Sequence, residues 1–167
     1  MQLHYGRGQF DRSARRAVRR EPTERLHVAA VCYRVSEDEI QFLLVRTQSG
    51  RWTFPKGGVD DDPTFAAAAG REAFEEAGVR GHVEHRPFAS YVHSKSSALK
   101  RREVEVSAHL CRVVHVGRAL EAYRDPTWFS FEAAKKRVRD NRRRKYAAEL
   151  ERVLEEAMER IQRRTRQ

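Results

Sequence analysis

The chain has 167 residues, 40% of them apolar, which suits one folded domain with a substantial core. Lysine and arginine outnumber aspartate and glutamate by 34 to 24, and the net charge of +10 favours polyphosphates, nucleic acid or an anionic surface as partners. There is neither a run of 18 apolar residues nor an apolar leader at the start, so we expect no membrane segment.

The beginning of the chain is strongly basic. Residues 1–24 hold six arginines and few apolar residues, which predicts a basic N-terminal arm preceding the domain. A transit peptide is the alternative interpretation, because several apolar residues in this segment recur at helical spacing.

The folded domain is expected to occupy residues 25–167 and to begin with strands. Residues 26–35 and 40–47 are rich in β-branched and aromatic residues, and the polar segment SEDE between them predicts a hairpin turn. Residues 51–55 predict a short strand that ends at a proline, and residues 56–58 predict a glycine turn.

The next segment carries the signals of a helix over residues 63–77. Asp62 suits the N-cap, Pro63 the first helical position, and Gly78 the left-handed position past the last turn. One side of this helix is expected to pack on the sheet through small and apolar residues, namely Ala66, Ala67, Gly70, Ala73, Phe74 and Ala77.

The rest of the chain predicts further strands and two helices. Residues 82–94 and 102–116 predict strands, and the basic segment 94–102 between them is expected to be mobile. Helices are predicted over 131–139 and about 142–163, the latter from its single apolar stripe. Strands on both sides of a central helix, followed by helices, predict a layered α/β domain with a mixed sheet.

The two cysteines, Cys32 and Cys111, lie singly within apolar, β-rich runs. Neither belongs to a CxxC pair, so we expect neither a disulfide framework nor a zinc site. A reducing, cytoplasmic setting is the expected location.

Three carboxylates crowd the end of the central helix. At about 100° per residue, Glu72, Glu75 and Glu76 fall within roughly 100° of one another, on one face. They repel each other and oppose the helix dipole, so their crowding favours binding of a hard divalent cation such as Mg²⁺ or Mn²⁺. Taken alone, the segment is also compatible with an ordinary solvated helix face.

Residues 57–79 resemble the Nudix box, in which a glycine, a glutamate and the pattern R-E-aliphatic-x-E-E-x-G-aliphatic recur at fixed spacing. The matching residues are Gly57, Arg71, Glu72, Ala73, Glu75, Glu76, Gly78 and Val79. One position departs from the pattern, because Pro63 stands where the family carries its first glutamate. The three aspartates just upstream, residues 60–62, are candidates to compensate.

The resemblance implies a Nudix-type α/β/α sandwich in which the box forms a loop-helix-loop. It implies Mg²⁺ or Mn²⁺ on Glu72, Glu75 and Glu76, together with a backbone carbonyl at Gly57. It further implies hydrolysis of a phosphoanhydride. The catalytic candidates are Arg71, Glu75 and Glu76, and one of the latter two glutamates is the candidate to take the proton of the attacking water.

Residues 26–139 also resemble, more weakly, the branch of the family that includes diadenosine polyphosphate hydrolases and diphosphoinositol polyphosphate phosphohydrolases. Basic residues around the box suit a substrate with many phosphates. The candidate substrate-binding residues are Lys56, Arg25, Arg46, Arg51, Lys95, Arg101 and Arg102. An ordinary solvated surface position is the alternative for each arginine. Tyr91 and His93 are candidates for either substrate contact or strand packing.

The expected function is therefore a metal-dependent pyrophosphohydrolase acting on a polyphosphorylated small molecule. Two alternatives stay open: a nucleoside triphosphate or the 5′ end of RNA as substrate, or binding of nucleotide or RNA without catalysis. The final helix is expected to dock its stripe on the sheet, with RNA binding or dimerisation as the alternative. The sequence leaves the oligomeric state open.

Overall fold

The structure, a computed structural model, describes residues 26–96 and 98–167. The expected basic arm and the candidate Arg25 lie outside this part of the chain. In chain order the elements are β1 His27–Ser36, β2 Glu39–Arg46, β3 Trp52–Thr53, β4 Lys56–Gly58, α1 Phe65–Ala77, β5 Val79–Val83, β6 Ala89–Ser96, β7 Arg101–Val116, a 3-10 turn Ala122–Arg124, β8 Thr127–Ser130, α2 Phe131–Arg139 and α3 Arg144–Thr165.

β1 is the central strand of a mixed sheet. It pairs antiparallel with β2 and parallel with β7, and the strand order through it is β3-β2-β1-β7-β5. Three further strands attach to this path, since β4 pairs with β1, β6 with β7 and β8 with β2. The unbroken apolar run at residues 28–33 explains the central position, because all six residues are buried and a strand covered on both faces needs no polar side.

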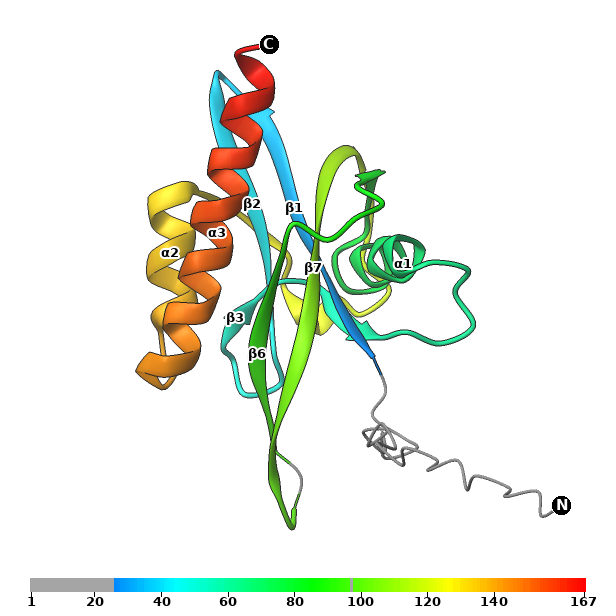
Figure 1. The fold of residues 1–167 in the computed structure, drawn as a ribbon, viewed down its shortest axis with the longest axis vertical. Helices are drawn as coiled ribbons and strands as arrows, with labels where there is room; N and C mark the ends of the chain where they lie inside the picture. Colours follow the sequence, from blue (N-terminus) through cyan, green and yellow to red (C-terminus); the bar gives the residue numbers. More distant parts are fainter. Residues whose placement is uncertain (1–25, 97) are drawn as a thin grey trace, which may run out of the picture.

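Helices cover both faces of the sheet, with α1 on one side and α2 and α3 together on the other (Figure 1). Alternate residues of β1 serve the two cores: Val28, Ala30 and Cys32 pack with the alanines of α1, and the residues between them pack with α2 and α3. The predicted α/β/α sandwich with a mixed sheet is confirmed. Among the described residues, no helix combines the length and the apolar content needed to cross a bilayer.

The start of α1 differs from the prediction. Thr64 is the N-cap, and its hydroxyl accepts a hydrogen bond from the amide of Ala67 at 3.0 Å. The prediction of Asp62 as the cap is wrong, because that carboxylate faces Arg71 instead, at 3.0 Å. Pro63 accordingly lies before the cap and not in the first turn.

The end of α1 agrees with the prediction. Gly78 has a left-handed backbone with φ of 69°, and its amide donates to the carbonyl of Phe74 at 2.9 Å. A Cβ at this position would lie 2.4 Å from the carbonyl carbon of Arg118, so both the backbone angle and the close approach require glycine.

Three connecting segments also differ from the prediction. Residues 56–58 form strand β4 and not a turn, because their backbone pairs with β1. Most of segment 94–102 belongs to the hairpin of β6 and β7, whose pairing continues to Ser96 and Arg101, so a mobile linker over this range is wrong. The strand predicted over 82–94 is interrupted, since β5 ends at Val83 and β6 begins at Ala89.

The N-cap gives a test of this local structure. Replacing Thr64 with alanine removes the acceptor for the amide of Ala67 and is expected to lower the free energy of unfolding by about 1 kcal/mol. Urea denaturation followed by circular dichroism measures the change. Thr64→Ser, which keeps the hydroxyl, should unfold like the unmodified chain; equal loss in both variants would contradict the assignment of the cap.

Candidate active site

The acidic face of α1 is turned toward β4. Glu72 and Glu76 are only 8% and 4% exposed, whereas the side chain of Glu75 is 36% exposed. The predicted packing side of the helix is therefore wrong in part, since Ala67 is exposed and both glutamates are buried with Ala73. Burial raises the pKa of Glu72 and raises that of Glu76 to about 7.

Gly57 is the residue that admits these carboxylates. A Cβ at this position would lie 2.2 Å from Oε1 and 2.4 Å from Cδ of Glu72, distances that no real side chain tolerates. The Glu72 carboxylate thus rests directly against the backbone of β4. The amide of Lys56 donates to Oε2 of Glu76 at 3.3 Å, so the same strand also holds the second buried carboxylate.

Arg71 contacts several of the acidic groups at once. Its guanidinium contacts Glu72 at 2.9 Å and Glu75 at 3.2 Å, and it donates to the carbonyl of Gly58 at 3.0 Å. Nε and NH2 also bind the carboxylate of Asp62, and Asp60 lies 3.7 Å away. These ion pairs raise the pKa of Arg71, with the hydrogen bonds that it donates to Asp62 contributing most.

Glu76 has a separate cationic partner that the sequence did not reveal. NH2 of Arg124, in the 3-10 turn after β7, lies 3.4 Å from Oε1 of Glu76. Arg124 is itself held by Glu121, whose Oε2 accepts from its Nε at 2.7 Å and whose amide donates to the carbonyl of Glu75 at 3.0 Å. The turn joins α1 only through tertiary packing, so no spacing signal in the sequence indicated either residue.

The donor set fits a hard divalent cation. Glu72, Glu75 and Glu76 supply carboxylate oxygens from one helical face, and the burial of two of them without full neutralisation favours a cation. Within residues 26–96 and 98–167, no three such side chains converge as a ready-made metal cluster. Instead, Glu72 and Glu75 are turned to Arg71, and Glu76 is turned to Arg124.

The candidate substrate residues separate into two groups. Lys56 and Arg51 both lower the pKa of His93, and Lys95 lowers that of Lys56, so these three charges act within one group. Of the three, Lys56 lies on β4 beside the acidic helix. Arg142, which the sequence did not single out, acts on both Lys56 and His93 and so belongs to the same group.

The other candidates lie elsewhere. The guanidinium of Arg46 stacks 4.6 Å from the ring centre of Trp52 and pairs with Asp125 at 3.5 Å, so its charge is already engaged. Arg101 and Arg102 are exposed at the end of the β6–β7 hairpin, which projects from the body of the domain in Figure 1.

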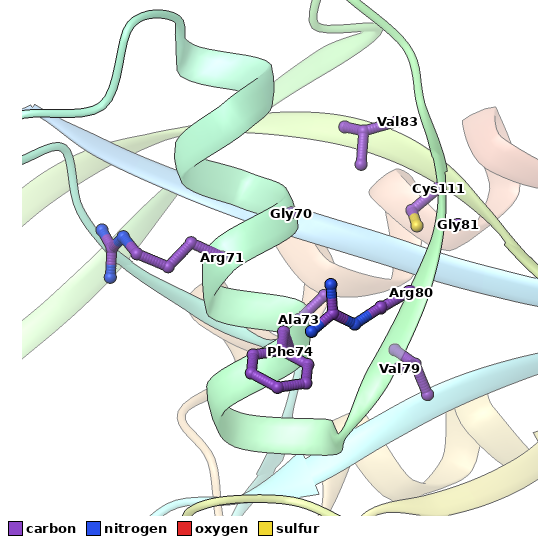
Figure 2. A pocket seen from close by; sticks show the side chains of 9 residues that line it. All are labelled: Gly70, Arg71, Ala73, Phe74, Val79, Arg80, Gly81, Val83 and Cys111. Atoms are coloured by element: carbon purple, nitrogen blue, oxygen red, sulfur yellow. The ribbon is translucent and has the colours of Figure 1, made fainter. Parts of the chain in front are cut away.

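A pocket of about 330 Å³ lies between α1 and β5 (Figure 2). Its lining is largely apolar and contains no carboxylate; it includes Ala73, Phe74, Val83 and Cys111. In the figure the guanidinium of Arg71 extends away from the other labelled side chains. The pocket is therefore on a different side of α1 from the acidic face, and the candidate active site is the face that Glu72, Glu75 and Glu76 present to β4.

The comparisons with known proteins identify the family and the fold. The family model described as the NUDIX domain matches residues 25–150, so the chain belongs to the NUDIX family. The C. elegans Ap4A hydrolase, solved as a binary complex, has the same fold, with a TM-score of 0.61 and 21% identity over 82% of this chain and 97% of that one.

Two curated relatives are similar over shorter stretches. Nudix hydrolase 17, mitochondrial, from Arabidopsis thaliana is 49% identical over 49 residues, which cover 29% of this chain and 27% of the relative. Diphosphoinositol polyphosphate phosphohydrolase 2 from Rattus norvegicus is 42% identical over 57 residues, covering 33% and 31%. The chain thus matches about a third or less of the length of each of these relatives.

Gly57 provides a sharp test of the site. In Gly57→Ala the added methyl group collides with the Glu72 carboxylate, so affinity for Mn²⁺, measured by calorimetric titration, is expected to fall by about tenfold or more. Gly70→Ala is the matched control, because its methyl group would meet Val83 at an ordinary 3.4 Å. Unchanged affinity in Gly57→Ala would show that the Glu72 carboxylate does not take part in binding the metal.

His93 gives a test of the electrostatics. Burial and the surrounding cations lower its pKa from 6.5 to about 3, so folding favours the neutral ring. That stabilisation is complete above pH 6.5 and is lost as the pH falls below it, by at most about 1.4 kcal/mol per pH unit. The free energy of unfolding from pH 7 to 5 should therefore fall more steeply in the unmodified chain than in His93→Gln; parallel curves would contradict the assigned environment.

Proposed function

We propose that this NUDIX protein is a metal-dependent pyrophosphohydrolase that cleaves phosphoanhydride bonds, with Mg²⁺ or Mn²⁺ as cofactor. One observation supports this most directly: Glu72 and Glu76 are buried against β4 with raised pKa values, which is unfavourable unless a cation binds. A divalent cation there would lower the pKa of a coordinated water and neutralise phosphate oxygens.

Each side chain of the site has a separate proposed role. Glu72 and Glu76 are fixed by β4 and suit metal binding, with the carbonyl of Gly57 as a further donor. Glu75 is the most exposed of the three and suits the role of proton acceptor for the attacking water. Arg71 orients Glu72 and Glu75, and Asp62 anchors Arg71 from the loop in which Pro63 replaces the glutamate of the family pattern.

The substrate proposed is a dinucleoside polyphosphate or a diphosphoinositol polyphosphate. The names of the Ap4A hydrolase and the rat phosphohydrolase support these two classes. The cations of Lys56, Arg51 and Lys95 are also suited to phosphates that the metals do not neutralise. Arg101 and Arg102 are proposed as outer contacts for a long polyanion.

A second candidate substrate is a nucleoside triphosphate or the triphosphorylated 5′ end of RNA. The exposed basic end of the β6–β7 hairpin favours it, because a projecting pair of arginines suits a long phosphate backbone. A cytoplasmic location is part of the proposal and is supported by the free, buried Cys32 and Cys111.

Incubation of the full chain with a substrate panel and Mg²⁺ or Mn²⁺, followed by phosphorus NMR of the products, tests the function. Diadenosine tetraphosphate or a diphosphoinositol polyphosphate should be cleaved faster than triphosphorylated RNA. Glu75→Gln is expected to lower turnover by a factor of about 10² to 10⁴. Glu159→Gln is the matched control, because it also changes a helical glutamate paired with an arginine at i+4 or i−4.

Three outcomes would count against the proposal. Full activity in Glu75→Gln would show that Glu75 is not the proton acceptor. Faster turnover of triphosphorylated RNA would transfer the function to the second candidate. Tight nucleotide or RNA binding without hydrolysis of any compound would indicate a binding protein and not an enzyme.

A further inference from the structure

A cluster of cations and one histidine forms where four elements meet. Arg51 precedes β3, Lys56 begins β4, His93 lies on β6 and Arg142 lies between α2 and α3. Tertiary contacts fix Arg142 there, since NH1 donates to the carbonyls of Trp52 at 2.9 Å and Val138 at 2.5 Å. The guanidinium is thus anchored on one side by backbone oxygens that carry no full charge.

Two cations of the cluster have no counter-charge. Within the described residues neither Arg51 nor Arg142 forms an ion pair with a carboxylate, whereas the charge of Lys56 is offset by Glu76. Two polar atoms beside it are also buried without a hydrogen-bond partner, Nε of Arg51 and the hydroxyl of Tyr91, whose residue is only 2% exposed. Unpaired buried donors are costly and rare, so their presence beside unneutralised cations indicates a missing acceptor.

The electrostatic effects of these groups on one another confirm that they are close. Burial and the charge of Arg51 together lower the pKa of Arg142 to about 10. Arg142 and Glu76 both act on the pKa of Tyr91, so the charges of the cluster and of the acidic helix both reach the unpartnered hydroxyl. His93 stays neutral at physiological pH, so it can offer an N–H without adding to the positive charge.

We propose that Arg51, Arg142 and Lys56 form an anion subsite that binds a phosphate group of the substrate other than the one cleaved, with His93 as a neutral hydrogen-bond donor. A phosphate supplies several acceptor oxygens and up to two negative charges, which matches both the orphaned donors and the excess cations. The inference rests on the proposed function, because it assigns the subsite to the same substrate as the acidic helix.

The subsite requires that the substrate have a phosphate beyond those at the bond that is cleaved. Under the proposed function, Glu72, Glu75 and Glu76 would hold the metal at the scissile bond, and the cluster would bind one more phosphate. The additional phosphate belongs either to a longer polyphosphate chain or to a phosphate ester on a ring. Both present the same group to the cluster, and two probes distinguish them.

Binding of inorganic tripolyphosphate and of inositol hexakisphosphate, measured by calorimetry with EDTA present, tests the subsite. Chelation removes the metal and any hydrolysis, so the measurement stays valid even if the proposed enzymatic function fails. Arg51→Gln and Arg142→Gln are each expected to weaken binding of at least one probe by about tenfold, because each removes a charged hydrogen-bond donor. The probe that is affected identifies a chain or a ring as the source of the phosphate.

The control is Arg144→Gln, which removes the same charge from an exposed position two residues further along the chain. It should change binding less than twofold. Arg142 also supports the fold through two carbonyls, so thermal unfolding of each variant is compared, and Arg51→Gln keeps the test decisive if Arg142→Gln fails to fold. Failure of the unmodified chain to bind either probe, unchanged binding in folded Arg51→Gln, or an equal loss in Arg144→Gln would each overturn the subsite.

Discussion

The site depends on the burial of two carboxylates against a backbone that has no side chain at the point of contact. Glu72 and Glu76 lose hydration when α1 packs on the sheet, and Gly57 gives them the space to do so. Desolvation raises the pKa of both residues and makes their charges expensive to maintain. Arg71 and Arg124 offset part of that cost, each from a different element, so α1, the loop before it and the turn after β7 are coupled through charge.

The cations are distributed unequally around this centre. Arg71 and Arg124 are each tied to carboxylates, with Asp62 and Glu121 as their outer partners. Arg51 and Arg142 have no such partners among the described residues. The proposed substrate, a polyanion, would therefore find paired cations at the acidic site and unpaired ones at Arg51 and Arg142.

Much of the fold and the candidate metal-binding face could be predicted because the signals are local. The apolar run at residues 28–33 indicated a buried strand, and Gly78 indicated the end of α1. The N-cap was misplaced because Asp62 and Thr64 are both suitable caps in sequence, and only the tertiary contact of Asp62 with Arg71 decides between them.

The basic side of the site was harder to predict for a related reason. Lysine and arginine are frequent throughout the chain, and nothing local distinguishes Arg142 from its neighbours in the run of arginines. Its position is decided by the carbonyls of Trp52 and Val138, one of them 90 residues away. Arg46 shows the opposite case, in which a plausible substrate residue is occupied by Trp52 and Asp125.

Strand β6 has a consequence that follows from its pleat. Tyr91, His93 and Lys95 occupy alternate positions, so their side chains leave the same face of the strand, and they pass from buried through half-buried to exposed. From the first to the third is about 13 Å at the usual rise of a strand. The face of the strand therefore offers three different polar groups at increasing exposure: a hydroxyl, then an imidazole, then an ammonium group.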